Sequence, residues 1–354
     1  MEFLYQYGIF LAKTLTIVIA IVLIIALIAG ISGRKKSGPK GHIEVTDLND
    51  FYQAMFDTVE DSVLTDAEFK VLEKERSKKA KAEAKQEKLV AKRGKDGALA
   101  NTKHRLFVID FDGDIKASQV DSLKQTISAI LRVATSQDEV LVKLESGGGM
   151  VHSYGLAASQ LDRIKAKEIP LTVAVDKIAA SGGYMMACVA NRIIAAPFAI
   201  IGSIGVVAQM PNFNRLLKKH DVDFELLTAG EYKRTLTMFG ENTDKGRSKF
   251  IEELELTHTL FKEYVVEHRQ GLDIDAVATG EIWYGRQALE KKLVDEICTS
   301  DQYIMDQLAE RRVVAVNYAL KKNLVERISG AAETSFDRLV IRWLTRLMPN
   351  RPPV

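Results

Sequence analysis

The sequence predicts an α/β protein with a mainly parallel sheet, built from βαβ units and attached to an N-terminal membrane helix. Two observations predict this architecture. Short apolar runs typical of buried strands alternate with stretches that have the three-and-four spacing of amphipathic helices. In addition, no charge interrupts residues 14–33, a stretch long enough to cross about 30 Å of hydrocarbon.

The apolar stretch predicts a retained membrane anchor at residues 1–33. It has Glu2 and no basic residue before Lys13, and its apolar core is longer than that of a cleaved signal peptide. The basic residues that follow, at 34–36, predict a cytoplasmic catalytic part by the positive-inside rule, and Lys13 on the other side weakens this asymmetry.

Residues 34–100 are predicted to be a linker followed by charged helices. Asp47 is placed to cap a helix whose apolar face runs from Leu48 to Val63, and the segment 65–68 has the pattern of a capping box. Lys, Glu and Ala dominate residues 70–95, which indicates a solvated, partly helical linker. Because acidic residues are interleaved there and the net charge is only +2, no nucleic-acid partner is expected.

Residues 101–300 are predicted to form the core. The expected strands are 106–111, 140–144, 171–175, 192–196 and 224–228, and the expected helices are 120–131, 156–164, 184–190, 214–220 and 246–269. Parallel sheets place their functional loops at the carboxyl ends of the strands, so the glycine-rich loops at 147–149 and 202–205 are candidates. Residues 301–354 are helical by pattern and end in an amphipathic tail that suits a membrane or a neighbouring chain.

Ser181 lies at a strand-to-helix junction, between two alanines and two glycines. A serine there can present its Oγ at the edge of the sheet, and the following helix directs N–H groups at a developing oxyanion. The alternative is a tight turn in which Ser181 only caps the helix. Of the six histidines only His152 follows a core strand, and the G-x-S-x-G elbow is absent, so a Ser-His-Asp arrangement is poorly supported.

A lysine can act as the base if it is neutral at the working pH, which requires a pKa about 3 units below the usual 10.4. Most lysines of this chain lie in charged stretches, where water surrounds them. Lys233 differs, because it follows a predicted strand, a glycine and an aromatic residue, where it could be desolvated. No cofactor or metal is expected, and Cys188 and Cys298 have neither zinc-site spacing nor a disulfide framework.

Four motifs in the same order resemble the signal peptide peptidase A family of serine–lysine proteases. They are AASGGYMMA, GSIGV, AGEYKR and WYGRQALEKKLVDE, and the resemblance covers roughly residues 105–300. It implies the Clp/crotonase fold, a spiral of βαβ units, and a ring-like homo-oligomer. It also implies a bacterial inner-membrane enzyme that cleaves membrane-associated or signal-peptide-like substrates, with peptides and the lipid bilayer as partners.

The resemblance implies a role for three side chains. The serine of the first motif is the family's nucleophile, which is Ser181 here. The lysine in the third motif is the general base, which is Lys233, 52 residues later. The serine of the second motif supports the lysine amine, which gives that role to Ser203. In some members the serine and the lysine of one site come from neighbouring chains; otherwise the loop 234–242 would have to cover the lysine within one chain.

The resemblance also implies an oxyanion hole formed by the N–H groups of Gly149 and Gly182. The family's loop usually reads SPGG, and this chain has Gly147 in place of the proline. That departure leaves Gly148 as an alternative donor. Two other functions remain open. One is a catalytically idle membrane scaffold that binds partners through its charged residues 70–95. The other is an acyl-CoA enzyme of the crotonase type, which would not need a serine–lysine pair.

Overall fold

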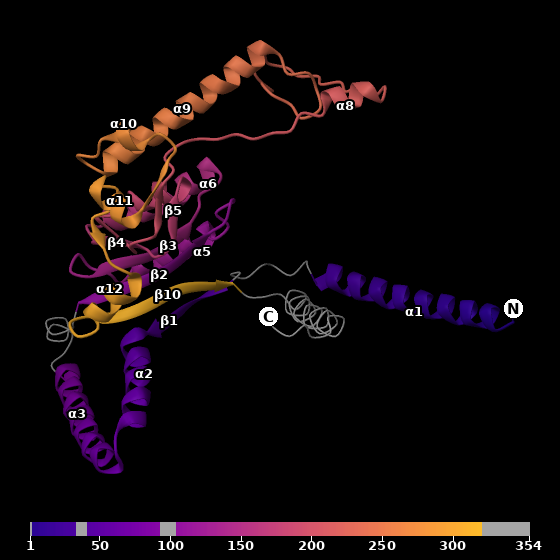
Figure 1. Cartoon of the computed structure of the whole chain (residues 1–354). Coiled ribbons are helices and arrows are strands. Elements are labelled where there is room, and N and C mark those ends of the chain that lie inside the picture. Colours follow the sequence, from indigo (N-terminus) through magenta and orange to yellow (C-terminus); the bar gives the residue numbers. More distant parts are fainter. Residues whose placement is uncertain (1, 33–40, 93–103, 321–354) are drawn as a thin grey trace, which may run out of the picture. The chain divides into compact units, whose positions relative to one another are not determined.

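The computed structural model describes residues 2–32, 41–92 and 104–320 (Figure 1). The chain divides into two compact units, residues 1–42 with 320–354, and residues 43–319. In the first unit the described chain forms one long helix, α1 (Glu2–Ser32). Within the described residues this is the one helix that is long and apolar enough to cross a membrane, in the window Tyr5–Val22. The position and character of α1 fit the predicted anchor.

A ten-stranded, mainly parallel sheet organises the larger unit. Its strands are β1 (Gly41–Asp47), β2 (Arg105–Gly113), β3 (Glu139–Ser146), β4 (Leu171–Val175), β5 (Ile178–Ala180), β6 (Arg192–Ala195), β7 (Ile200–Gly202), β8 (Ile282–Tyr284), β9 (Glu296–Ile297) and β10 (Arg312–Leu320). The main order is β1-β10-β2-β3-β4-β6-β9. The short strands β5, β7 and β8 branch from β3: β5 pairs in parallel with β3 and β7, and β7 pairs with β8 antiparallel.

Helices connect and cover these strands. They are α2 (Leu48–Val63), α3 (Asp66–Lys92), α5 (Val120–Ile130), α6 (Val151–Lys165), α7 (Gly182–Ala187), α8 (Asn214–Lys219), α9 (Asp244–His268), α10 (Ile274–Val277), α11 (Gly285–Glu290) and α12 (Ser300–Gln307). The Asp47 side chain caps α2 as predicted, by accepting from two backbone N–H groups. At α3 the Glu68 carboxylate accepts from both the N–H and the hydroxyl of Thr65, so only half of the predicted capping box forms.

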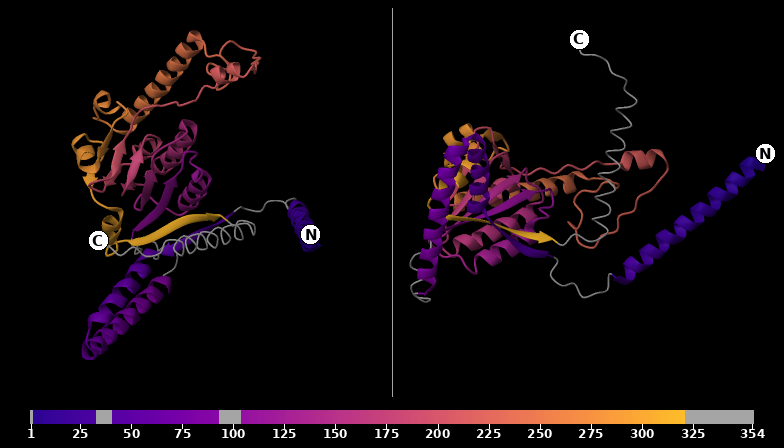
Figure 2. Two further views of the ribbon diagram at one scale, coloured as in Figure 1. Left: turned by 45° about the vertical axis from the view of Figure 1, so that its right-hand side comes forward. Right: turned by 90° about the horizontal axis from the view of Figure 1, so that it is seen from below.

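The predicted fold class is confirmed. From β2 to β4 the chain alternates strands with helices, and the neighbouring strands β2, β3, β4 and β6 pair in parallel. Strand β3 pairs with β2 and β4, and its last residue, Ser146, also lies opposite Ala179 of β5. The βαβ units therefore wind around a branched sheet, as a Clp/crotonase-like spiral does. Figure 2 shows the sheet and its helices from two further directions, with much of α9 extending beyond the sheet.

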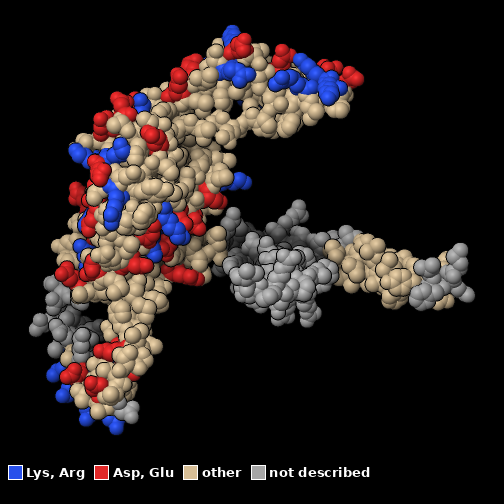
Figure 3. Space-filling model, in the orientation of Figure 1, with Lys and Arg blue, Asp and Glu red and all other residues tan. Residues whose placement is uncertain are grey.

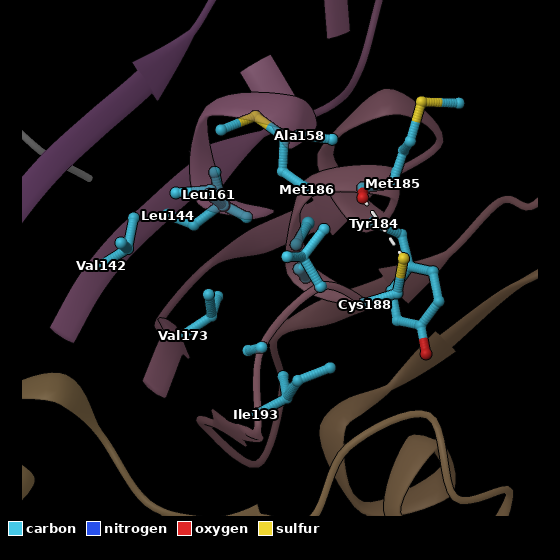
Figure 4. Packing of buried hydrophobic residues seen from close by; sticks show 14 of the residues in the cluster. Val142, Leu144, Ala158, Leu161, Val173, Tyr184, Met185, Met186, Cys188 and Ile193 are labelled. Carbon is cyan, nitrogen blue, oxygen red and sulfur yellow. Dashed lines mark hydrogen bonds between the residues drawn. The ribbon is translucent and has the colours of Figure 1, made fainter. Parts of the chain in front are cut away.

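Helix α7 lies at the centre of the hydrophobic core. All six of its residues are buried, and the residues that follow it, through Ala190, are buried too. Figure 4 shows Tyr184, Met186 and Cys188 packed with side chains from β3, β4 and α6. Close packing of this kind leaves little room for movement. The junction between β5 and α7 is therefore held rigidly. Both cysteines are free and buried, as expected of plain thiols.

Three predictions of local structure were wrong. Residues 224–228 form no strand, because no neighbouring strand lies beside them and Leu227 is 90% exposed. Residues 312–320, expected to be helical, form β10, whose valines are buried where it pairs with β2. Strand β1 lies in the segment predicted as a linker. The tail at 321–354 lies outside the described residues, and the predicted region boundaries at 33, 100 and 300 stay predictions.

Candidate active site

Ser181 joins β5 to α7 with an unusual backbone conformation. Its φ and ψ are 52° and −119°, in a region that residues with a Cβ seldom adopt. The side chain makes no capping hydrogen bond to α7, so the capping role considered above is not seen. Its N–H donates to the Gly202 carbonyl at 2.8 Å. The hydroxyl of Ser181 is thus half-buried and free of the helix that follows it.

Ser203 occupies the matching position on the next strand. In the parallel β5–β7 pair Ala180 lies opposite Gly202, and both strands end there. Ser181 and Ser203 are therefore the first residues past two adjacent strand ends. Ser203 also has a positive φ, 50°, and its N–H donates to the Glu281 carbonyl at 2.6 Å. The sheet thus brings together two predicted site residues that are 22 positions apart in sequence.

The glycine loop lies against the backbone of the Ser181 junction. A Cβ on Gly148 would lie 2.6 Å from the Gly182 nitrogen and 2.8 Å from the Ala180 oxygen, so no side chain fits there. The Gly148 N–H donates to the Ser146 Oγ at 3.0 Å. Within the described chain, the N–H groups of Gly149 and Gly182 donate to no protein acceptor. Of the two alternatives for the loop donor, the geometry therefore favours Gly149.

Apolar side chains border this loop. Ile115 is 72% exposed, and its carbonyl accepts from the Met150 N–H at 2.9 Å. Met150 and Val151 are also exposed. A Cβ on Gly149 would collide with the Ile115 carbonyl, so the loop and this apolar rim are in direct contact. The rim of Ile115, Met150 and Val151 offers an apolar surface beside Gly149.

Lys233 lies apart from these groups, on the segment 207–243, which we call the arm. Its side chain is exposed and has no hydrogen bond or ion pair in the described part of the chain. Its neighbours are held to α9: Glu231 pairs with Lys245 at 2.5 Å, and Lys249 lies 5.4 Å from the centre of the Tyr232 ring. These contacts leave Lys233 facing solvent. The strand from which its desolvation was predicted does not exist.

The arm is held by its own residues and by the first turns of α9. Asn212 donates to two carbonyls of the returning segment, and Phe239 packs against Phe213 and Phe224. Figure 1 shows the chain around α8 standing away from the sheet. No described hydrogen bond, ion pair or ring contact joins the arm to β5, α7 or the glycine loop. One chain by itself therefore assembles the serine side of the predicted site but does not bring Lys233 to it.

Sequence reasoning missed two buried residues beneath the glycine loop, Ser146 and Tyr154, whose oxygens lie 2.5 Å apart. Nothing in the local sequence marks them, because their proximity arises only when β3 and α6 pack. His152 is exposed at the start of α6 and has no described hydrogen bond to Ser181. Among the described residues, no group of three or more His, Cys, Asp and Glu is placed to hold a metal ion.

Comparison with known proteins places these features in a family. The family model described as "Peptidase family S49 N-terminal" matches residues 2–161, and "Peptidase family S49" matches residues 163–310. The "Probable protease SohB" of Haemophilus influenzae is 50% identical over 98% of this chain and 97% of its own length. A protein of the same name from Buchnera aphidicola subsp. Acyrthosiphon pisum is 48% identical over 97% of this chain and 98% of its own length.

Among solved structures, a mutant of the "1510-N membrane-bound stomatin-specific protease" in complex with a substrate peptide is similar, at 14% identity. The match covers 66% of this chain and 99% of that one, with a TM-score of 0.39. The near-complete match to the two relatives, at about half identical residues, establishes the family. This chain belongs to peptidase family S49 and is a protease.

Proposed function

We propose that this chain is a membrane-anchored serine endopeptidase in which Ser181 is the nucleophile and Lys233 is the general base. The observation that carries the proposal is the conformation of Ser181. Its φ is positive, its side chain makes no hydrogen bond to α7, and the glycine loop lies against it, since a Cβ on Gly148 would be 2.7 Å from the Ser181 Cβ. Backbone strain of this kind costs about 1–3 kcal/mol and persists where the surrounding structure enforces it, which is common at active sites.

The proposed reaction has two halves. Ser181 Oγ attacks the carbonyl carbon of the scissile peptide, and its proton passes to the neutral Nζ of Lys233. The N–H groups of Gly149 and Gly182 bind the oxyanion that forms. The C–N bond then breaks as the lysine returns the proton to the leaving amine, which leaves an acyl-enzyme on Ser181. Water, deprotonated by the same lysine, hydrolyses this ester. Ser203 accepts from or donates to the lysine amine and so holds it in place.

The lysine of each site is proposed to come from a neighbouring chain. Lys233 must lose water to become neutral, and within one chain it is exposed on the arm. The segment 234–242 does not cover it, because that segment packs back on Asn212 and Phe213 instead. The arm also exposes apolar side chains that a neighbour would bury: Val207, Leu216, Val222, Leu226, Leu227 and Tyr232. Figure 3 shows few charges on the underside of the arm, whereas Lys and Arg gather near its tip.

A mixing experiment tests the shared site. Ser181→Ala and Lys233→Ala proteins are each expected to be inactive. If sites are shared, a mixture that has exchanged subunits recovers part of the activity, since some interfaces pair an intact serine with an intact lysine. No recovery in a mixture shown to have exchanged would mean that each chain supplies its own pair. Cross-linking through a cysteine placed on each variant confirms the exchange.

The nucleophile is tested by labelling with a serine-reactive peptidyl phosphonate. The wild-type chain should be labelled on Ser181, and Ser181→Ala should not be labelled. An unlabelled wild-type chain would favour the idle scaffold. Turnover of an acyl-CoA thioester that survives in Ser181→Ala would favour the crotonase-type enzyme, which needs no serine nucleophile.

The substrates are proposed to be membrane-associated peptides with apolar residues near the cleaved bond. The apolar helix α1 would keep the enzyme at a bilayer, and the rim of Ile115, Met150 and Val151 borders the proposed oxyanion donors. Peptide libraries should therefore show higher kcat/KM for apolar than for charged residues at the cleavage site. Ile115→Glu should weaken that preference. The basic residues at 34–36 favour the cytoplasmic side, which a compartment-sensitive reporter fused to the C-terminus would test.

A further inference from the structure

Two buried hydroxyl groups lie directly beneath the glycine loop. Ser146 is the last residue of β3, and Tyr154 lies in the first turn of α6. Their side-chain oxygens are 2.5 Å apart, and the residues are 2% and 0% exposed. Neither residue has a part in the reaction proposed above. Buried hydroxyl groups lose their contact with water, so they are retained where they make hydrogen bonds that matter to the fold or to the site.

The hydrogen bonds of this pair connect the glycine loop to the backbone carbonyls of Gly113 and Asp114. The Gly148 N–H donates to the Ser146 Oγ at 3.0 Å, and the Tyr154 hydroxyl donates to the Asp114 carbonyl at 2.7 Å. Each hydroxyl has one proton, so when Tyr154 donates to the Asp114 carbonyl, Ser146 donates to the Tyr154 oxygen. When Ser146 instead donates to the Gly113 carbonyl, 3.2 Å away, Tyr154 donates to Ser146. Hydrogen bonds arranged in series strengthen one another in a dry interior.

The ring of Tyr154 supports the other side of the site. A Cβ on Gly182 would collide with the Tyr154 Cγ and would lie 2.7 Å from its Cδ2, so the ring lies directly against the Gly182 backbone. The hydroxyl of the same residue reaches the glycine loop through Ser146. Tyr154 therefore contacts Gly182 directly and reaches Gly148, the neighbour of Gly149, through the Ser146 hydroxyl.

We propose that Ser146 and Tyr154 are positioning residues that fix the spacing of the Gly149 and Gly182 N–H groups for a tetrahedral oxyanion. The inference rests on the proposed function of those N–H groups. Because the Gly148 N–H donates to the Ser146 Oγ, that group points inward, and the Gly149 N–H is left to bind the substrate. Gly147 adds no support, since a Cβ there would meet nothing closer than the Ile178 side chain at 3.8 Å.

The chemistry of Tyr154 suits this role at neutral pH. Burial raises the pKa of the Tyr154 phenol, and the hydrogen bond with Ser146 offsets only part of the rise. The phenol therefore stays protonated and keeps a proton to donate within these hydrogen bonds. The nearby carboxylates of Asp114 and Asp112 also raise the pKa of the Tyr154 phenol.

Tyr154→Phe is the test, because it keeps the ring against Gly182 and removes only the hydroxyl. We expect kcat to fall about tenfold or more and KM to stay within about twofold, since an oxyanion donor acts mainly in the transition state. Affinity for a peptidyl boronate, which forms a tetrahedral adduct with Ser181, should fall in parallel with kcat/KM. Ser146→Ala should lose a similar factor, and the double variant should be little worse than either single one.

Tyr184→Phe is the matched control. Tyr184 is also 0% exposed, and its hydroxyl donates to the Leu293 carbonyl at 3.0 Å, with no described link to the glycine loop. This variant should lose a comparable amount of thermal stability and keep its kcat within about twofold. A Tyr154→Phe protein that loses no more kcat than Tyr184→Phe, or that shows only a higher KM, would overturn the proposal.

A second measurement separates this proposal from the proposed function. In inactive Ser181→Ala protein, amide hydrogen exchange at Gly148 should be at least tenfold faster when Tyr154 is replaced by Phe. Unchanged exchange would refute the hydrogen-bond chain, whatever the role of Ser181. Failure of the phosphonate to label wild-type Ser181 would instead refute the serine mechanism, and the exchange result would still test the chain.

Discussion

Replacing neighbouring glycines of the loop by alanine should have opposite effects at positions 147 and 148. Gly148 has a φ of +88°, and a Cβ there would lie 2.6–2.8 Å from the Gly182 nitrogen, the Ser181 Cβ and the Ala180 oxygen. Gly147 has no positive φ, and its added Cβ would meet only the Ile178 side chain at 3.8 Å, an ordinary contact. The two positions have the same residue type and share one loop, so each variant is the control for the other.

The cost at Gly148 has two parts. A left-handed conformation with a Cβ costs roughly 1–2 kcal/mol, and overpacking against a rigid neighbour adds about 1–3 kcal/mol. Relief of the contacts requires the loop to move by close to 1 Å, because carbon atoms pack at about 3.5–4.0 Å. A displacement of that size in a catalytic group can cost about 100-fold in rate. Gly148→Ala should therefore lose about 2–5 kcal/mol of stability and most of its activity.

The effect at Gly147 should be small and favourable. Gly147→Ala reduces the freedom of the unfolded chain and should raise the free energy of unfolding by about 0.4–1 kcal/mol. Its kcat/KM should stay within a small factor of wild type. Urea unfolding followed by circular dichroism measures the first quantity, and cleavage of a fluorogenic peptide measures the second. Equal stability and activity in the two variants would refute the reasoning, because the contacts around Gly148 would then carry no cost.

Three further predictions follow from the site and the core. Lys233→Arg should be as inactive as Ser181→Ala, because a guanidinium stays protonated; substantial cleavage by it would remove Lys233 from the mechanism. Activity should rise with pH, since only a neutral lysine accepts a proton, and a rise that disappears in His152→Ala would identify a histidine base instead. Burial alone would raise the pKa of Asp138, but hydrogen bonds from Arg105 and Thr135 lower it to about 2. A carboxylate whose pKa is lowered by folding stabilises the folded state at pH values above its unfolded pKa of 3.8, here by about 2 kcal/mol. This stabilisation is lost as the pH falls from about 4 to about 2. Asp138→Asn should lower the unfolding free energy at pH 7 and flatten its dependence over that range; an unchanged acid-unfolding curve would contradict this.

The buried part of the fold could be predicted because burial leaves a periodic pattern in the sequence. Strand β4 was found from its apolar run and helix α5 from its apolar face, and Asp47 marked the start of α2. The short strands β5, β7 and β8 have three residues each, too few for any period. Residues 224–228 show the opposite error: β-forming side chains do not make a strand where no neighbouring strand can pair with them.

The site was predictable in its residue types but not in its assembly. The junction at Ser181 could be inferred from small residues between an apolar strand and an apolar helix. Lys233 stood out because it follows a predicted strand, a glycine and an aromatic residue, and the resemblance to a family gave it the role of base. Its exposure in one chain could not be foreseen, because it depends on where the arm packs. The contact between Ser146 and Tyr154 joins a strand end to a helix, and a single sequence gives no sign of such a pair.

The position of β10 has a consequence for how the enzyme is made. In the sheet β10 lies between β1 and β2, yet it comes last in the described chain. At about 5–20 residues per second, a ribosome needs roughly 10–40 s to pass from the end of β2 to the start of β10. Throughout that interval β1 has no partner strand and β2 has one unpaired edge, the kind of edge on which chains aggregate. Synthesis therefore has to reach residue 320 before the nascent sheet can close, and a chain cut short before β10 would leave β1 with nothing to pair with.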